Sequence, residues 1–321
     1  MMKSAQIKSY GGSDVIEISQ PTSTPNLAAG NVLVEIKAAG INPVDWKIRE
    51  GYMQQMMPIQ FPSTLGMDFS GVIKQVGEGV TSSDFKQGDE VYGQAGVTNG
   101  GSGAFAELAL ANVEHIAYKP KRLNYLEAAA LPLVGVSAWQ ALVENIGLSK
   151  DQKILIHVGA GGIGSISIQL AKKLGAYVAT TVNVNDKQFV EKLGADEVID
   201  YKTQAFEDLI HNYDAVYDAV SGETYTKSFR LLKKGGIIVS MLEQPNTELM
   251  QQFGVKAIFQ FTQVNKERLR KLAEFVDQQD NNIEIHIDRT FPLDEARKAL
   301  DYQKDVHPRG KIVLVIQNKS T

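Results

Sequence analysis

Residues 153–164 read KILIHVGAGGIG, an apolar run that leads directly into a glycine-rich turn. The apolar residues of its first half predict a strand covered on both faces, as in a parallel sheet. The spacing of the apolar residues that follow predicts a helix over 163–174 that stops at Gly175. A strand, a glycine turn and a helix in this order can hold the pyrophosphate of a dinucleotide at the amino end of the helix.

Each residue of the turn has an expected role. Gly159 allows the tight turn, Gly161 lets the backbone approach the phosphates, and Gly164 permits close contact between helix and strand. Gly162 and Ile163 begin the helix and offer their amides to the same phosphates. The alternative is a tight strand–helix turn that binds no ligand, because glycine triplets also occur in ordinary loops.

Composition limits the class of protein. A chain of 321 residues with 43% hydrophobic and 22% charged residues predicts an ordinary globular protein of more than one domain. The net charge of −4 gives no electrostatic reason to expect a nucleic acid or an anionic membrane as partner. No apolar run is long enough to predict a membrane span, and the amino-terminal segment lacks the apolar core of a signal peptide. We therefore expect a cytoplasmic protein.

The chain has no cysteine, which excludes disulfides, thiolate nucleophiles, iron–sulfur clusters and cysteine-ligated zinc. Its five histidines are scattered and show no metal-binding spacing. We expect no metal site.

From residue 153 onward, strand and helix patterns alternate, which predicts a doubly wound parallel sheet of six strands. The expected strands are 153–158, 176–182, 197–200, 213–219, 236–241 and 254–259, and the expected helices are 163–174, 186–193, 205–211 and 222–233. Residues 234–236 are interpreted as a helix stop before the fifth strand.

The flanking parts differ from this pattern. Short strands at 32–37, 71–76 and 89–92, separated by Gly, Pro, Ser and Asp, indicate an antiparallel, barrel-like domain. After residue 264 we expect a helix, a strand, a helix and a final strand at 266–278, 283–291, 293–302 and 311–316. The terminal strands are expected to return to the amino-terminal domain, and residues 128–143 to form a buried helix that joins the two lobes.

Several segments then point to one family. They are 40–51 (GINPVDWKIREG), 62–72 (PSTLGMDFSGV), 88–92 (GDEVY), 131–138 (LPLVGVSA), the glycine turn, 193–196 with 199–201, and 310–313 (GKIV). In this order and spacing the chain resembles a zinc-free medium-chain dehydrogenase/reductase of the NADPH:quinone oxidoreductase and enone reductase branch.

The resemblance implies an α/β fold with two domains. A GroES-like antiparallel, partly open barrel, the catalytic domain, would take residues 1–124 and 264–321. A doubly wound six-stranded parallel Rossmann domain that binds NADPH would take residues 125–263. The resemblance also suggests a homodimer formed through the sheet edge near residues 255–261.

Departures from the zinc-dependent branch also inform the prediction. Asn42 lies where zinc alcohol dehydrogenases have a catalytic cysteine, and their Gly-His-Glu motif becomes Gly-Met-Asp at 66–68. Oxidation of a simple alcohol needs a Lewis acid to stabilise the alkoxide. The sequence therefore favours a reaction that needs no metal.

The residue after the second strand of the Rossmann pattern indicates which nicotinamide cofactor binds. NAD-binding folds usually carry an acidic residue there, about 20 residues past the glycine turn, and this chain has Asn183. A neutral side chain leaves room for a 2′-phosphate, and Lys187 could pair with that phosphate. Asp186 argues the other way unless it caps a helix, and Lys187 could equally be a solvated helix lysine. NADPH is favoured over NADH.

Further cofactor contacts are expected at Thr181 and at Tyr201, the latter by resemblance to a tyrosine of the quinone reductases. Ser137 stands where the family usually has a threonine that contacts the cofactor.

The resemblance also implies three candidate residues for the reaction itself, and each has a structural alternative. Asn42 could hydrogen-bond the substrate or the cofactor ribose, or it could cap the loop before Pro43. Asp45 could orient that loop or simply form a turn. Tyr52 could line the acceptor pocket or donate a proton, or it could be a packing residue in a methionine-rich segment.

Without a metal or a cysteine, the expected task is to hold the nicotinamide against an electron-poor small molecule and to exclude water. We expect hydride transfer from NADPH to quinones or α,β-unsaturated carbonyls. The alternatives are reduction of a dedicated metabolite such as an enoyl thioester, and an NADPH-binding structural or regulatory protein with little turnover. The proton donor and the physiological acceptor stay open.

Overall fold

The computed structural model describes residues 2–316. Within that part, the chain divides into two units. The first takes the segment up to Leu133, Val264–Asp280 and the segment from Ile287 on, and the second takes Val134–Gln263 and Asn281–His286. Residue 1 and residues 317–321, which the sequence places in the first domain, lie outside the described residues.

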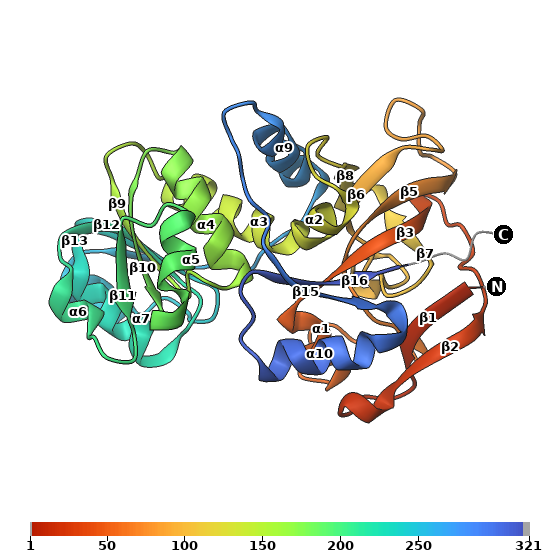
Figure 1. Cartoon of the computed structure of the whole chain (residues 1–321), viewed down its shortest axis with the longest axis horizontal. Coiled ribbons are helices and arrows are strands. Elements are labelled where there is room, and N and C mark those ends of the chain that lie inside the picture. Colours follow the sequence, from red (N-terminus) through yellow and green to blue (C-terminus); the bar gives the residue numbers. More distant parts are fainter. Residues whose placement is uncertain (1, 317–321) are drawn as a thin grey trace. The chain divides into compact units, whose positions relative to one another are not determined.

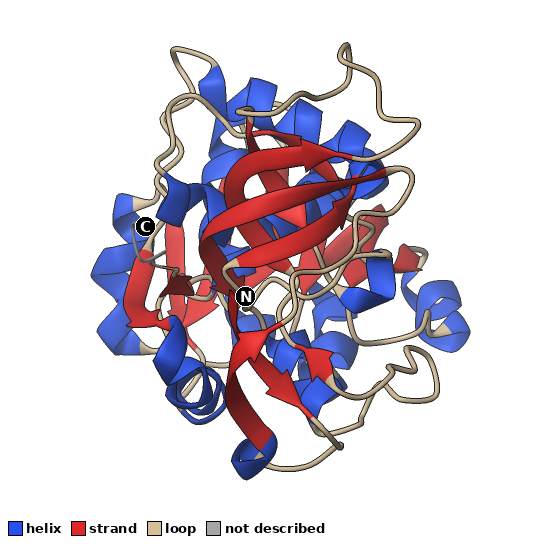
Figure 2. Ribbon diagram, turned by 90° about the vertical axis from the view of Figure 1, so that its right-hand side faces the viewer, coloured by secondary structure: helices blue, strands red, loops and turns tan. Residues whose placement is uncertain are grey.

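The first unit is built on a sheet that joins distant parts of the chain. Its strand order is β15-β16-β3-β5-β6-β8, with β7 paired to β3. The pairs are antiparallel except for β15 with β16, which run parallel. Figure 1 shows the late strand β16 beside the early strand β3, and Figure 2 shows the long strands of this unit in red. The bounds are β3 Asn31–Ile41, β5 Asp68–Val76, β6 Glu90–Gln94, β7 Leu108–Asn112, β8 Ile116–Tyr118, β15 Ile287–Pro292 and β16 Lys311–Val315.

A small second sheet and the α-helices α1, α2, α9 and α10 also belong to this unit. The small sheet has the order β2-β1-β4. The bounds of these elements are β1 Met2–Ile7, β2 Ile16–Thr22, β4 Ser63–Thr64, α1 Pro43–Arg49, α2 Tyr125–Ala130, α9 Lys266–Asp277 and α10 Ala296–Asp305.

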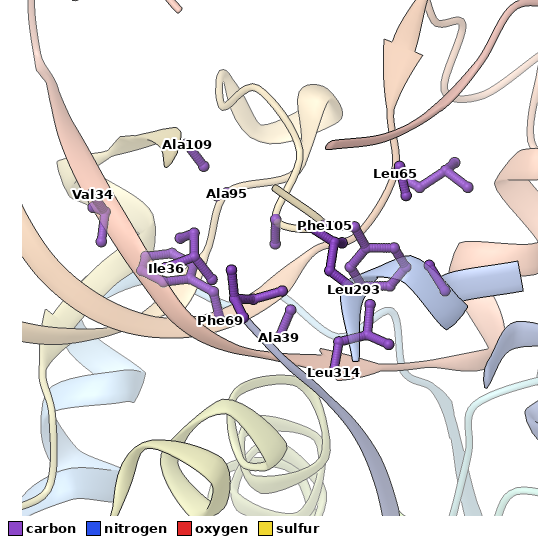
Figure 3. Packing of buried hydrophobic residues seen from close by; sticks show 14 of the residues in the cluster. Val34, Ile36, Ala39, Leu65, Phe69, Ala95, Phe105, Ala109, Leu293 and Leu314 are labelled. Carbon is purple, nitrogen blue, oxygen red and sulfur yellow. The ribbon is translucent and has the colours of Figure 1, made fainter. Parts of the chain in front are cut away.

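The core of the first unit is apolar and brings both ends of the chain together. Phe69 and Phe105 are fully buried in one cluster with Ile36 of β3 and Leu314 of β16 (Figure 3). Because alternate residues of β3 point into this cluster, the apolar period of the strand determines which face is buried.

The second unit contains six parallel strands in the order β11-β10-β9-β12-β13-β14 among the described residues. Their bounds are β9 Lys153–His157, β10 Tyr177–Val182, β11 Glu197–Asp200, β12 Tyr213–Asp218, β13 Leu232–Ser240 and β14 Lys256–Phe259. The strand order reverses between β9 and β12, and in doubly wound sheets ligands bind beyond the carboxyl ends of the strands at that point. The predicted fold class is confirmed.

The helices of the second unit follow the strands as expected. They are α4 Gly162–Lys173, α5 Lys187–Lys192, α6 Phe206–Leu209, α7 Gly222–Ser228 and α8 Thr247–Phe253. Helix α4 ends as predicted, since Gly175 adopts a φ of 82° just past its carboxyl end.

Three local predictions were wrong. Residues 128–143 do not form one helix: α2 ends at Ala130, α3 (Pro132–Trp139) begins at the proline, and a π-helix follows over Gln140–Ile146. Proline favours the first turn of a helix, so Pro132 begins a helix rather than continuing one. Residues 234–236 belong to β13 and accompany an irregularity in its pairing with β12. The strand expected at 283–291 begins only at Ile287.

Candidate functional site

The glycine turn after β9 is shaped by two close approaches. A Cβ at Gly159 would lie 2.1 Å from Oγ1 of Thr180, and a Cβ at Gly164 would lie 2.1 Å from the carbonyl oxygen of Val158. Gly159 is therefore required for contact with β10, and Gly164 for contact between α4 and the end of β9. The unusual backbone of the turn is at Val158, which has a φ of 58°, a conformation rare for a β-branched residue.

Gly161 differs from these two glycines. Its φ is −73°, which any residue can adopt, and a Cβ there would meet its nearest neighbour, Val158, at an ordinary 3.4 Å. Neither packing nor backbone conformation requires a glycine at this position. What Gly161 leaves open is the space above the first turn of α4.

That space faces the start of a 12-residue helix. Gly161 is the N-cap of α4 and has no side chain with which to cap it. The amides of Gly162, Ile163 and Gly164 lie in the first turn, where a helix provides no carbonyl partner. Such a turn can bind an anionic phosphate group through backbone N–H groups and the positive end of the helix dipole.

The ends of β10 and β11 bring the other expected cofactor residues together. Val182 pairs with Asp200, and the N–H of Tyr201 donates to the carbonyl of Val182 at 3.2 Å. Asn183 follows β10, and its side-chain oxygen accepts from the amide of Asn185 at 3.1 Å. That bond leaves the side-chain N–H groups of Asn183 as donors, and the ring of Tyr201 is exposed.

Lys187 is the first residue of α5 and is exposed. Within residues 2–316 its one ion pair is with Glu191 at 3.8 Å on the same helix, and exposed pairs of this kind contribute little. Its ammonium group is thus available to an anion. Asp186 is the N-cap of α5, but its side chain makes no capping hydrogen bond to that helix, contrary to the role expected for it.

Thr181 is turned into the protein. It is buried, and its hydroxyl lies 2.9 Å from Nδ1 of His157, whose Nε2 lies 3.0 Å from the hydroxyl of Ser228. Ser228 donates its own hydrogen to the carbonyl of Thr224 at 2.6 Å, so it accepts from Nε2–H of His157. Nδ1 of His157 therefore accepts from Thr181. Burial lowers the pKa of His157 to about 4, which keeps the ring neutral.

Ser137 is also buried. Its hydroxyl lies 2.8 Å from the hydroxyl of Thr262, and its carbonyl accepts from Gln260 at 3.0 Å. Both expected hydroxyl contacts, Thr181 and Ser137, thus already have partners inside the second unit.

In the first unit, Asn42 and Asp45 begin α1. The backbone N–H of Asn42 donates to Oδ2 of Asp45 at 2.7 Å, and the amide of Asp45 donates to the carbonyl of Asn42 at 3.0 Å. This reciprocal pair fixes the start of the helix, with Pro43 in its first position. Burial raises the pKa of Asp45 to about 7.

Asn42 is fully buried and joins two charged residues that the sequence does not place together. Its side-chain N–H donates to Oδ2 of Asp68 at 2.9 Å, and its side-chain oxygen accepts from the ammonium of Lys311. Lys311 also donates to the carbonyl of Ile41 at 2.5 Å. The side chain of Asn42 is thus used inside the protein rather than held open for a ligand.

Asp68 accepts three hydrogen bonds. Besides Asn42, they come from the amide of Leu133 at 3.0 Å and the side chain of Gln94 at 2.8 Å. Asn99 donates to Gln94 at 2.8 Å, so the glycine-rich segment that contains Asn99 is anchored to the same network. We call Asn42, Asp45, Asp68 and Lys311 the buried polar cluster.

Burial raises the pKa of Asp68 and lowers that of Lys311, while their mutual attraction opposes both effects. The only sequence signal for Lys311 was the segment at 310–313, which contributed to the family resemblance without a role for the lysine. Strand pairing explains its position, because Ile312 of β16 lies opposite Ile41 of β3.

The donor set of the cluster does not fit a metal ion. The amide oxygen of Asn42 already accepts from a cation, and both oxygens of Asp68 accept hydrogen bonds. Within residues 2–316 no group of three or more His, Cys, Asp or Glu side chains could hold a metal. No helix of that part is long and apolar enough to cross a membrane.

Tyr52 lies apart from the buried polar cluster. It is 72% exposed, and its ring packs edge-on against Trp46 with 6.0 Å between the centroids. It begins an exposed turn segment in which Met56 is 63% exposed. Tyr52 thus contacts Trp46 and Lys47 at the surface, and no hydrogen bond or ring contact within residues 2–316 joins it to the buried Asn42 or Asp45.

Comparisons with known proteins agree with this architecture. Residues 28–121 match the family described as "Alcohol dehydrogenase GroES-like domain", and residues 193–314 match "Zinc-binding dehydrogenase". The chain is 35% identical to 2-methylene-furan-3-one reductase of Solanum lycopersicum, over 98% of this chain and 79% of the relative.

Solved structures are similar over nearly the whole chain. The quinone oxidoreductase from Coxiella burnetii is 33% identical, with a TM-score of 0.88 over 98% of this chain and 99% of that one. The Escherichia coli quinone oxidoreductase complexed with NADPH is 26% identical, with a TM-score of 0.86 over 98% of this chain and 99% of that one.

Proposed function

The chain belongs to the medium-chain dehydrogenase/reductase family and is an NAD(P)H-dependent oxidoreductase, and from that premise we propose that it uses NADPH to reduce quinones or α,β-unsaturated carbonyls. As part of the proposal, the second unit binds the cofactor and the first unit provides the acceptor chemistry.

Gly161 is the observation that carries the proposal. A glycine that neither packing nor conformation requires leaves the first turn of α4 open, and the backbone amides there suit a pyrophosphate. The residues present thus fit a dinucleotide. Gly159 and Gly164 then shape the turn, while Gly161, Gly162 and Ile163 contact the ligand.

The preference for NADPH rests on Asn183, Lys187 and Tyr201. A neutral Asn183 does not repel a 2′-phosphate, Lys187 supplies a positive charge, and the exposed ring of Tyr201 offers a surface for stacking. We leave Thr181 and Ser137 out of the direct contacts, because their hydroxyls already have partners.

A bound reduced nicotinamide supplies a hydride, and the chain supplies orientation and a proton path. With an enone, the hydride forms a C–H bond at the β-carbon, and the resulting enolate takes one proton at the α-carbon. The buried polar cluster fixes the start of α1 and holds one carboxyl group whose pKa of about 7 lets it carry a proton near neutrality. No step requires a metal.

The test is an acceptor panel with purified protein, following the absorbance of the reduced cofactor with NADPH and with NADH. We expect oxidation with quinones and enones, faster with NADPH at limiting cofactor. The Gly161→Ala variant is the matched control, because it should fold like the wild type but bind NADPH more weakly. Failure to bind or consume NADPH with any acceptor would refute the proposal, and binding without turnover would support a structural role instead.

Two further parts of the proposal are a homodimer through β14 and a cytoplasmic location. Strand β14 pairs with β13 along one edge and is the last strand of its sheet. Light scattering and cell fractionation measure these properties directly.

A further inference from the structure

A very small cavity lies beside the start of α1. Its volume is about 10 Å³, and it is lined by Asp45 and Ile48, by residues 63–67 and by residues 96–98. We call it the Asp45 cavity. A space of this size holds one water molecule if two or more polar groups face it.

Two oxygen atoms from the lining residues have no hydrogen-bond partner among the described residues. They are Oδ1 of Asp45 and Oγ1 of Thr98, and both are buried. The other carboxylate oxygen of Asp45 accepts from the amide of Asn42, so only Oδ1 is unpaired. Leaving a buried polar group without a partner costs about 1–3 kcal/mol, and such groups in folded proteins are usually satisfied by an ordered water.

The cavity adjoins a larger groove. That groove has a volume of about 390 Å³ and shares Ser63, Thr64 and Val97 with the lining of the Asp45 cavity. Its lining residues include no Asp, Glu, Lys, Arg or His. The groove and the cavity are therefore neighbours along these three shared residues.

Charged and polar groups face Asp45 from each neighbouring element. Asp68 of β5 opposes its ionisation, while Lys311 of β16 and the backbone amides of Asn42 and Met67 favour it; of these two amides, Asn42 donates a hydrogen bond to Oδ2. Burial has the largest effect and raises the pKa of Asp45 to about 7. Asp45 thus gains and loses a proton near neutral pH, although it is almost fully buried.

We propose that the Asp45 cavity binds one water molecule that bridges Asp45 and Thr98 and carries protons between the groove and Asp45. In each transfer the bridging water gives one proton to Oδ1 of Asp45 and receives one from water in the groove, so it is unchanged at the end. Only the use of that proton in a reduction rests on the proposed function.

Thr98 allows a direct test, because valine has nearly the same shape without the hydroxyl and serine keeps it. Crystal structures of the wild type and of Thr98→Ser should contain an ordered water between residues 45 and 98, and Thr98→Val should not. An empty cavity in the wild type would overturn the proposal.

Proton exchange provides a second readout that needs no turnover. The infrared band of the protonated Asp45 carboxyl, assigned by its loss in Asp45→Asn, should shift on transfer into D2O. Loss of one hydrogen bond to the bridging water should slow this shift about tenfold in Thr98→Val and little in Thr98→Ser. Equal rates in the wild type and Thr98→Val would contradict the proposal, even if the protein reduces no acceptor.

Discussion

Asn42 donates to Asp68 at 2.9 Å while it accepts from Lys311, so one neutral amide joins a buried cation to a buried anion. Within residues 2–316, no hydrogen bond or ion pair links Lys311 directly to Asp68. The orientation of the amide is determined by chemistry, since an ammonium can only donate and an ionised carboxylate can only accept.

The first prediction concerns this pair. Lys311→Met removes the cation and leaves Asp68 buried with one negative charge, so we expect the free energy of unfolding to fall by about 3–5 kcal/mol. The double variant Lys311→Met with Asp68→Asn should recover part of that loss.

Lys74→Met, which breaks an exposed ion pair with Glu35, is the control and should lower the free energy of unfolding by less than about 1 kcal/mol. Urea denaturation measures all of these variants. A double variant no more stable than Lys311→Met would mean that charge balance is not the reason.

The second prediction separates two glycines of one turn. Gly161→Ala should lower stability by no more than about 1 kcal/mol, because its Cβ meets only ordinary contacts. It should weaken NADPH binding, since the methyl group would occupy the space left for the phosphates. Gly164→Ala should instead destabilise the fold by about 2 kcal/mol or more, because its Cβ would lie 2.1 Å from the carbonyl of Val158.

Thermal denaturation and fluorescence titration with NADPH give the two readouts for these variants. If Gly161→Ala binds NADPH as tightly as the wild type, the open space above α4 is not the phosphate site.

The third prediction concerns cofactor preference. Asn183→Asp places a carboxylate beside the expected 2′-phosphate, so the Kd for NADPH should rise about tenfold while the Kd for NADH changes little. Lys187→Ala should act in the same direction, and Lys192→Ala, on the same helix, is its control. Parallel titrations with both cofactors measure the ratio. Equal losses for NADPH and NADH would place Asn183 and Lys187 away from the phosphate.

The second unit was predictable from sequence because its signals are local. The glycine turn, the apolar strand after Lys153 and the stop at Gly175 each depend on residues that are neighbours in the chain. The wrong predictions arise where a local sequence signal conflicts with the structure that forms. Pro132 favours a helix start over continuation. Residues 234–236 resemble a helix stop, but they lie inside β13, between Leu232 and Ile237, which both pair with β12.

The buried polar cluster could be predicted only in part. Asn42 and Asp45 are three residues apart, so their reciprocal hydrogen bonds follow from a local capping pattern. The contact of Asn42 with Lys311 spans 269 residues and depends on the pairing of β16 with β3, for which sequence periodicity gives no register. Sequence also could not show that Thr181 points toward His157. Both faces of a buried parallel strand are covered by protein, so the strand lacks the alternation of apolar and polar residues that would reveal which way a side chain points.

The last prediction is the pH dependence that His157 imposes on the second unit. Its pKa is about 4 in the folded protein, against about 6.5 in an unfolded chain, because burial disfavours the charged ring. Between these values the unfolded chain binds a proton that the folded protein does not. Stability is therefore fully present above pH 6.5 and falls as the pH drops toward 4, by about 3 kcal/mol in total for this group.

His157→Gln keeps a side chain that can both donate and accept but cannot titrate, so it should remove most of this slope. Its stability at neutral pH can fall without affecting the test, because the slope between pH 4.5 and 6.5 is the quantity compared. Urea denaturation across that range, with His211→Gln as an exposed histidine control, gives the measurement. An unchanged slope in His157→Gln would mean that other groups cause the acid sensitivity and that folding does not lower the pKa of His157.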